Sequence, residues 1–338
     1  MVRLPHLFVL LPALLAACSS DSRLPEFELS GSTMGTTFNI LLVDPSEDLP
    51  KEQLRSGIAE TLERVDRLAS TWRSDSELST LNANSDTDWI DVSAELCAAL
   101  EQALEVSEQS YGAFDVTIGP LVNLWGFGPD GAVIEPPTDD ELAAVMAAVG
   151  YRKLQTKCER PAVRKQNTDV YVDLSGWAKG FAVDELAALL DEYDLKNYLV
   201  EIGGELKVRG YNAENLKWVI AVEAPSKTLR KPHSVLRVTD TSVATSGDYR
   251  NFFNHDGKQY SHTIDARTGK PVSHGLAAVT VVSESAAYAD AMATALLVLG
   301  PKEGLELAEN LGLAGYFLVR GGQGIQEKTT RNFDLLRN

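Results

Sequence analysis

The sequence predicts an α+β protein in which antiparallel sheets pack against helices. Apolar residues at helical spacing predict several amphipathic helices in the first half of the chain. The middle of the chain instead shows short strand patterns separated by tight turns, which favours antiparallel pairing over a βαβ series. The 338 residues, 44% hydrophobic and 23% charged, are enough for one large domain or two fused lobes.

The elements follow in chain order. In the first half the patterns predict a strand over 36–43 and helices over about 51–69, 94–110 and 139–149. Residues 126–137 are rich in Gly and Pro and are expected to form a loop. The second half predicts a strand over 170–174, a helix over 177–190, strands near 197–202, 205–210, 217–223, 234–240 and 277–283, a helix over about 285–299, and a final helix and strand.

The N-terminus indicates export. A basic start at Arg3 precedes a short apolar run that ends at Ala17 and is too short to span a membrane. Leu-Ala-Ala-Cys18 resembles the bacterial lipobox, whose cysteine is acylated and becomes the new N-terminus; an ordinary cleaved signal is the alternative. Ser19 then favours the outer membrane, facing the periplasm, over the inner membrane. We therefore expect a signal peptide over 1–17, a tether over 18–27 and one domain over 28–338.

The net charge and the spacing of the cysteines argue against several classes of function. The net charge of −17 becomes −18 when Arg3 is removed with the signal, and such acidity argues against a nucleic-acid partner. After the signal only Cys97 and Cys158 remain besides Cys18. Neither has the spacing of a nucleophile or metal ligand, so both are interpreted as structural. A disulfide between them fits an oxidising compartment, but the sequence leaves their pairing open.

A strand-turn-helix corner, V-D-L-S-G-W-A-K-G-F, is the strongest local pattern. Asp173 closes the strand and Lys179-Gly180 falls in the first turn of the helix. Unpaired N–H groups at a helix start favour phosphate, and Lys179 adds a full positive charge there. Gly180 would let a ligand approach the backbone. The alternative is an ordinary corner with a solvated lysine.

Asp290 and Thr294 lie four residues apart on an otherwise apolar helix, so they share a face. A carboxylate on a buried helix needs a partner or a metal, and hard oxygen ligands suit Mg²⁺. The alternative is an aspartate that accepts backbone N–H bonds. Zinc has no support, because the chain has no H-E-x-x-H and no Cys/His cluster.

Two other motifs are rejected on context. Gly126 to Gly131 matches G-x-G-x-x-G, but Pro129 lies inside it and no helix follows, so it is not a dinucleotide fingerprint. Ser175 and Lys179 are one residue too far apart for the S-x-x-K of penicillin-binding enzymes.

Several motifs together resemble the ApbE family of FAD:protein FMN transferases. They are the corner above with G-S-T-M-G-T-T-F (Gly31–Phe38), F-D-V-T-I-G-P-L-V (Phe114–Val122), S-V-A-T-S-G-D-Y-R (Ser242–Arg250), Y-S-H-T-I-D-A-R-T-G (Tyr260–Gly269) and A-D-A-M-A-T-A-L (Ala289–Leu296). The resemblance runs from about Gly31 to the C-terminus. It implies a T-fold-like α+β protein with two related lobes. It also implies Mg²⁺-dependent cleavage of FAD, with FMN passing to a threonine hydroxyl and AMP released.

The resemblance also implies roles for single residues. Flavin contacts carried over by motif are Met34, Trp72, Ala113, Phe114, Asp115, Asp173, Lys179 and Ile264. The metal would be held by Asp290, Thr294 and the backbone carbonyl of Gly176. Catalytic roles fall to Asp290 and, as a candidate general base, His262; a lone histidine in this run could equally be an ordinary strand residue. The family commonly has Tyr or Phe at position 72, and its I-A-K-G and D-P-R-T-G read W-A-K-G and D-A-R-T-G here.

Three functions remain open at this point. The leading one is the transferase, whose acceptor would be an exported or membrane redox protein with a D-x-x-T-like motif. With water as acceptor the chain would be a periplasmic FAD pyrophosphatase. Without catalysis it would be a lipid-anchored flavin carrier.

Overall fold

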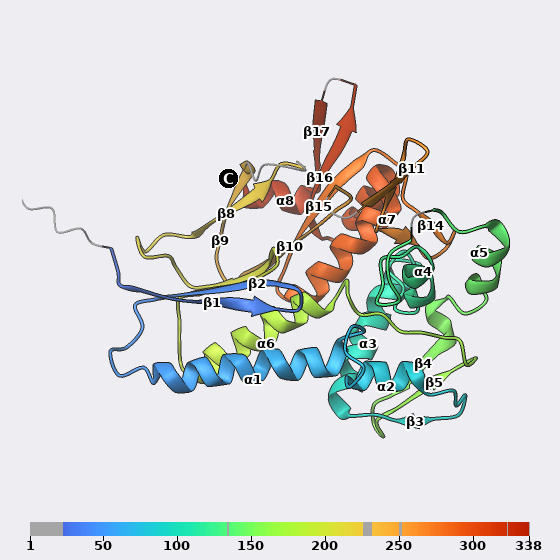
Figure 1. Cartoon of the computed structure of the whole chain (residues 1–338). Helices are drawn as coiled ribbons and strands as arrows, with labels where there is room; N and C mark the ends of the chain where they lie inside the picture. The colour runs from blue at the N-terminus through green and yellow to red at the C-terminus, as the bar shows by residue number, and fades with distance from the viewer. Residues whose placement is uncertain (1–22, 134, 226–231, 250–251, 323, 338) are drawn as a thin grey trace, which may run out of the picture.

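The computed structural model describes residues 23–337 except 134, 226–231, 250–251 and 323. Its centre is an eight-stranded sheet in which every neighbouring pair is antiparallel (Figure 1). The strands, in spatial order, are β1 (Glu26–Thr33), β2 (Thr36–Val43), β6 (Tyr198–Ile202), β7 (Glu205–Arg209), β10 (Thr241–Gly247), β15 (Leu276–Ser283), β16 (Ala314–Gly321) and β17 (Gly324–Thr329). The structure confirms the predicted α+β class.

The sheet is built from two related halves. In the first, β1 and β2 precede helix α6 (Ala178–Glu192), and β6 and β7 follow it. In the second, β10 and β15 precede helix α7 (Ala286–Asn310), and β16 and β17 follow it. Helices α6 and α7 contact each other, and both also contact strands of the sheet (Figure 1). The helical run of α7 breaks at Gly300, which has a φ of 79° and directly precedes Pro301. The first part of α7 therefore ends at the predicted position.

Helix α1 (Lys51–Ala69) covers the predicted residues. Its apolar stripe is buried against α6, which is why the helical spacing was informative: Leu54, Ile58, Leu62, Val65 and Leu68. Helix α3 (Ala94–Gln109) is confirmed too, with Ser93 capping its start. Helix α5 (Asp139–Met146) begins as predicted but ends three residues early, in a tight turn before Gly150.

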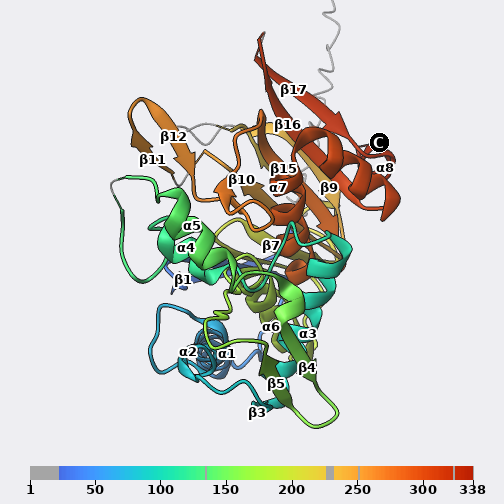
Figure 2. The same cartoon turned by 90° about the vertical axis from the view of Figure 1, so that its right-hand side faces the viewer.

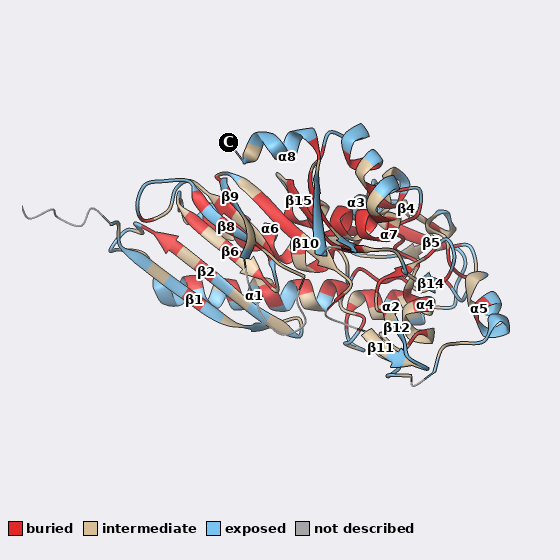
Figure 3. Ribbon diagram, turned by 90° about the horizontal axis from the view of Figure 1, so that it is seen from above, coloured by how far each residue is buried: buried red, intermediate tan, exposed pale blue. Residues whose placement is uncertain are grey.

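The remaining elements surround this core, as the burial pattern in Figure 3 shows. A small sheet of β3 (Ile90–Asp91), β5 (Ala162–Lys165) and β4 (Leu154–Lys157) lies at the far end of the molecule from β17 (Figures 1 and 2). The others are α2 (Glu77–Ala83), α4 (Gly119–Leu124), η1 (Tyr151–Lys153), α8 (Arg331–Leu336), and the pairs β8 (Trp218–Glu223) with β9 (Pro232–Val238), β11 (Phe252–His255) with β12 (Lys258–Ser261), and β13 (Ile264–Asp265) with β14 (Lys270–Pro271).

The strand predicted over 170–174 is wrong. The Asn82 side chain takes the place of a neighbouring strand: its Oδ1 accepts the Val172 N–H at 2.7 Å and its Nδ2 donates to the Val172 carbonyl at 2.8 Å. The Asp173 N–H then donates to the Val116 carbonyl at 2.8 Å. The segment is extended and buried as the alternation suggested, but its partners are a side chain and a loop.

The structure also settles the cysteines, because Cys97 and Cys158 form a disulfide. It joins the first turn of α3 to the residue after β4. At the N-terminus, β1 begins at Glu26, inside the last two residues of the expected tether. The expected signal peptide and Cys18 lie outside the described residues. Within the described residues, no helix is both long and apolar enough to cross a bilayer.

Candidate functional site

A cavity of about 430 Å³ lies where the start of α6, the middle of α7 and the end of β10 meet. It brings together almost all predicted site residues from five distant segments: Trp72, Ala113, Phe114, Asp115, Asp173, Gly176, Lys179, His262, Ile264, Asp290 and Thr294. Since these residues were chosen from sequence motifs alone, their convergence in one cavity supports the prediction of a common site.

The corner before α6 shapes one wall of the cavity. The Asp173 carboxylate accepts the Ser175 N–H at 2.7 Å and thereby holds the turn. Helix α6 then begins without a side-chain cap from its N-cap residue, although the Ala178 N–H donates to the Leu174 carbonyl at 2.8 Å. The positive end of the helix dipole lies at this wall. Trp177, the departure from the family pattern, is 1% exposed and stacks on Phe181 with ring centroids 4.5 Å apart. Its ring therefore fills the core beneath the corner.

Gly180 has a different role from the one expected. A Cβ on Gly180 would lie 2.2 Å from the Ala286 carbonyl oxygen, so this glycine lets α6 and α7 touch. Its N–H donates to Asp290 Oδ2 at 3.2 Å. The close approach serves helix packing rather than a ligand, and it brings Asp290 to the first turn of α6.

Lys179 lies between two buried carboxylates. Its Nζ is 3.5 Å from Asp290 Oδ2 and 3.8 Å from Glu205 Oε1. Burial opposes its charge, but the two carboxylates outweigh burial and raise the pKa of Lys179. Burial raises the pKa of Glu205 to about 8, although Lys179 opposes the shift. The lysine is therefore a fixed cation at the point where a phosphate would meet the helix start.

Three oxygen donors fit a magnesium ion beside Lys179. Asp290 is 2% exposed, and Thr294 lies one turn further along α7 with its hydroxyl 3.0 Å from that of Ser246. The Gly176 backbone borders the same point, since a Cβ there would lie 3.3 Å from Thr294 Oγ1. A carboxylate, a hydroxyl and a carbonyl are ligands that Mg²⁺ accepts, leaving positions for waters or phosphate oxygens. The described residues contain no group of three or more His, Cys, Asp or Glu placed to bind a metal.

Aromatic side chains border the cavity and form the surface on which a flavin ring is expected to stack. Trp72 is 68% exposed at the cavity edge, whereas Phe114 is buried in its wall. Phe127 meets His262 edge-on, with ring centroids 6.2 Å apart. Exposed and half-buried rings beside a phosphate-binding corner suit a ligand with a planar ring system at one end and phosphates at the other.

Asp115 lines the cavity, but its side chain holds the surrounding loop. One carboxylate oxygen accepts from the Thr117 N–H and hydroxyl at 2.8 and 2.6 Å, and the other accepts from the Tyr151 N–H at 2.8 Å. Burial raises the pKa of Asp115, and these hydrogen bonds oppose the rise. Its carboxylate thus fixes the position of Ala113 and Phe114, and direct contact with a flavin stays a prediction.

Met34 is the predicted residue that the structure does not bring to the cavity. It occupies the turn between β1 and β2 with φ of 47°, and it lines a separate hollow of about 380 Å³ with residues of α1. The resemblance implied a flavin contact for Met34, which stays a prediction. The direction of that turn depends on how β1 and β2 pack on α1, which the motif does not encode.

Glu205 is the site residue that sequence reasoning missed. It is 4% exposed, and its Oε2 has no hydrogen-bond partner. It opens β7 directly after Gly203-Gly204, and an acidic residue at such a strand end is ordinarily exposed. The sequence carried no signal that Lys179, 26 residues earlier, would lie beside it.

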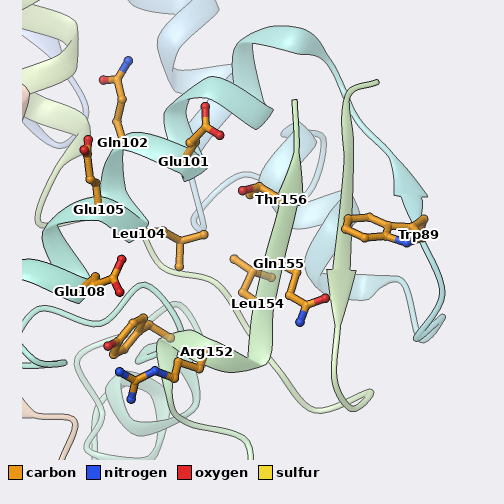
Figure 4. A pocket seen from close by; sticks show the side chains of 11 residues that line it. Trp89, Glu101, Gln102, Leu104, Glu105, Glu108, Arg152, Leu154, Gln155 and Thr156 are labelled. Carbon is orange, nitrogen blue, oxygen red and sulfur yellow. The ribbon is translucent and has the colours of Figure 1, made fainter. Parts of the chain in front are cut away.

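A larger groove of about 790 Å³ lies between α3 and β4, on another part of the surface (Figure 4). Three glutamates of α3 border it: Glu101, Glu105 and Glu108. Arg152 is the cation among its lining residues, and no predicted site residue borders it. Its predominantly negative charge would repel a dinucleotide, so size alone does not make it the substrate site.

Comparisons with known proteins identify the family of the chain. A sequence model of the ApbE family matches residues 34–317. A Haemophilus influenzae protein named FAD:protein FMN transferase is 40% identical over 327 residues, covering 95% of this chain and 94% of that protein. An Escherichia coli protein of the same name is 36% identical, covering 88% and 85%.

Two solved structures show the same fold. The Vibrio cholerae flavin transferase ApbE superposes with a TM-score of 0.86 at 38% identity, covering 93% of this chain and 99% of that one. The apo Pseudomonas stutzeri flavinyl transferase ApbE gives 0.85 at 38% identity, covering 93% and 98%. With a family model that matches residues 34–317 and relatives that match over most of its length, the chain belongs to the ApbE family.

Proposed function

We propose that the chain is an FAD:protein FMN transferase that uses Mg²⁺. The observation that carries the proposal is the cluster of Lys179, Asp290 and Thr294 at the start of α6, inside a cavity with an aromatic rim. The names of the relatives supply the reaction class. FAD is the substrate, and a protein with a D-x-x-T-like motif is the acceptor.

Substrate binding follows from the two ends of the cavity. The isoalloxazine ring would lie near Trp72 and the Phe114 wall, where aromatic stacking and apolar burial favour it. The pyrophosphate would lie at the first turn of α6, where N–H groups and Lys179 attract negative charge. Mg²⁺ held by Asp290, Thr294 and the Gly176 carbonyl would neutralise further phosphate charge.

The transfer step is a substitution at phosphorus. The acceptor threonine oxygen forms a bond to the phosphorus of the FMN half, and the bond from that phosphorus to the bridging oxygen breaks. The AMP half leaves with the bridging oxygen and its electron pair, while the hydroxyl proton passes to a base. We assign this proton to His262, which lines the cavity near Phe127. Lys179 stabilises the charge on the phosphates throughout.

One incubation tests the proposal. The purified protein is mixed with FAD, with or without Mg²⁺ and a peptide containing D-x-x-T, and the products are separated by mass. A transferase gives FMN on the peptide threonine and one AMP for each transfer, only with Mg²⁺. FMN and AMP without labelled peptide would identify a pyrophosphatase, and intact FAD in every mixture would identify a carrier. A peptide with valine in place of threonine controls for the acceptor.

We also propose that the mature protein is a periplasm-facing lipoprotein anchored through Cys18, in the outer membrane as Ser19 favours. Several acyl chains on one cysteine attach a protein stably to a membrane, whereas a single acyl chain does not. Cys18→Ala should leave the protein unlipidated and uncleaved at this site. Intact-mass measurement of the mature N-terminus tests this: a wild-type N-terminus other than acylated Cys18 contradicts it.

A further inference from the structure

The chain enters the domain at a fixed point. The Leu24 N–H donates to the Ala213 carbonyl at 2.8 Å. Arg23 pairs with Glu26 at 2.8 Å and with Glu214 at 3.6 Å. The first described residues are therefore fastened to the turn between β7 and β8, two residues before β1 begins.

That turn is held in shape by Asn212. Its Oδ1 accepts the N–H groups of Glu214 and Leu216 at 3.1 and 2.9 Å. Its own N–H donates to the Leu216 carbonyl at 2.8 Å. A turn pinned in this way presents its side chains in fixed directions.

The pinned turn presents apolar side chains to the outside. Leu216 is 63% exposed and Tyr211 is 47% exposed, and Val219, at the start of β8, is 54% exposed. Large exposed apolar side chains gathered at one place mark interaction surfaces. Lys217 adds a positive charge beside them, whereas the charge of Arg23 is offset by Glu26 and Glu214. An exposed apolar tip fits the interface of a lipid bilayer.

The length of the tether selects the bilayer as the partner. From Cys18 to Arg23 the chain advances five residues, which span at most about 17 Å when fully extended. Acyl chains on Cys18 would therefore keep the turn within that distance of the membrane. We propose that Tyr211 and Leu216 dock this turn onto the lipid surface that holds the anchor. The inference rests on the proposed lipidation.

Docking would set the orientation of the enzyme. In Figures 1 and 3 the start of β1 and the β8–β9 pair lie toward one end of the molecule, with α4, α5 and β14 at the opposite end. Helix α4 supplies Val122 to the cavity lining. With the turn on the bilayer, this side of the cavity faces away from the membrane, toward an approaching acceptor protein.

A single label tests the docking. Cys97 and Cys158 form a disulfide and Cys18 would carry the acyl chains, so Leu216→Cys supplies one free thiol for an environment-sensitive fluorophore. Ile325→Cys is the matched control, because Ile325 is an exposed β-branched residue at the tip of the β16–β17 hairpin, away from the chain's entrance. The lipidated full chain is reconstituted into vesicles of phosphatidylethanolamine and phosphatidylglycerol, with and without nitroxide-labelled lipid.

We expect the label at 216 to shift its emission to shorter wavelength in vesicles and to lose at least half its intensity to nitroxide lipid. The label at 325 should do neither. Protein that floats with the vesicles but gives the same signal at both positions overturns the docking. Protein that does not float shows the lipidation proposal to be wrong and overturns the inference with it; neither result touches the FMN transfer measured separately.

Discussion

Replacing Lys179 with methionine tests the electrostatics of the site most directly. The variant keeps the length and apolar stem of the side chain and removes its charge. Asp290, 2% exposed, would then be a buried carboxylate without its cation, beside Glu205, whose raised pKa keeps it mainly protonated at neutral pH. Lys179→Met should therefore destabilise the protein even though no large group is lost.

The distances set the size of the effect. At the 3.5 Å separation from Asp290, the attraction is worth roughly 5 kcal/mol at an effective dielectric constant of about 20. Glu205, with a pKa of about 8, is mainly neutral at pH 7 and adds less. Desolvation of the three groups offsets much of this, and removing one partner of a buried pair costs about 3–5 kcal/mol in practice. For a chain of this length such a loss corresponds to a fall in Tm on the order of 10 °C.

Thermal unfolding measured with EDTA and with Mg²⁺ checks the reasoning. Lys179→Met should lose most stability without metal and regain part of it with Mg²⁺, because a dication can replace the lost charge near Asp290. Adding Asp290→Asn should restore stability by removing the unpaired carboxylate. Lys196→Met is the control, since Lys196 is a surface lysine and should change Tm little. A Lys179→Met protein as stable as the wild type in EDTA would refute the account.

Four further outcomes follow from the site. Asp290→Asn should remove the Mg²⁺ binding measured by calorimetry. The asparagine oxygen can still accept the Gly180 N–H. Unchanged Mg²⁺ affinity would exclude Asp290 as a ligand. His262→Ala should slow single-turnover FMN transfer by about 10²–10⁴-fold with FAD affinity retained, and an unchanged rate would leave His262 without a role as base. Because the folded-state pKa of Glu205 is raised to about 8, the stability it contributes is fully present at low pH and is lost as pH rises from its unfolded value through about 8. Glu205→Gln should flatten that decline in metal-free unfolding curves, and a decline as steep as the wild type's would assign it to other groups. Cys97→Ser should cost about 4 kcal/mol, because the disulfide closes a loop of 61 residues; denaturant unfolding of the oxidised wild type and the variant measures the difference, and equal midpoints would contradict it.

Sequence alone determined the elements whose information is local. The periodicity of α1 identified which face is buried, since a helix repeats its buried face every three or four residues. The motifs of the family resemblance also named residues that, except for Met34, line one cavity.

Tertiary structure decided whatever depended on a distant partner. The alternation of residues 170–174 indicated that this segment is buried. It did not indicate that the segment bonds to the Asn82 side chain and not to a neighbouring strand. Gly180 became a helix contact because Ala286 approaches it, and the pairing of the two cysteines needed β4 to lie beside α3. Glu205 acquired its role only when the sheet placed it next to Lys179. A side chain's burial and charge partners come from residues far along the chain, and local pattern carries no record of them.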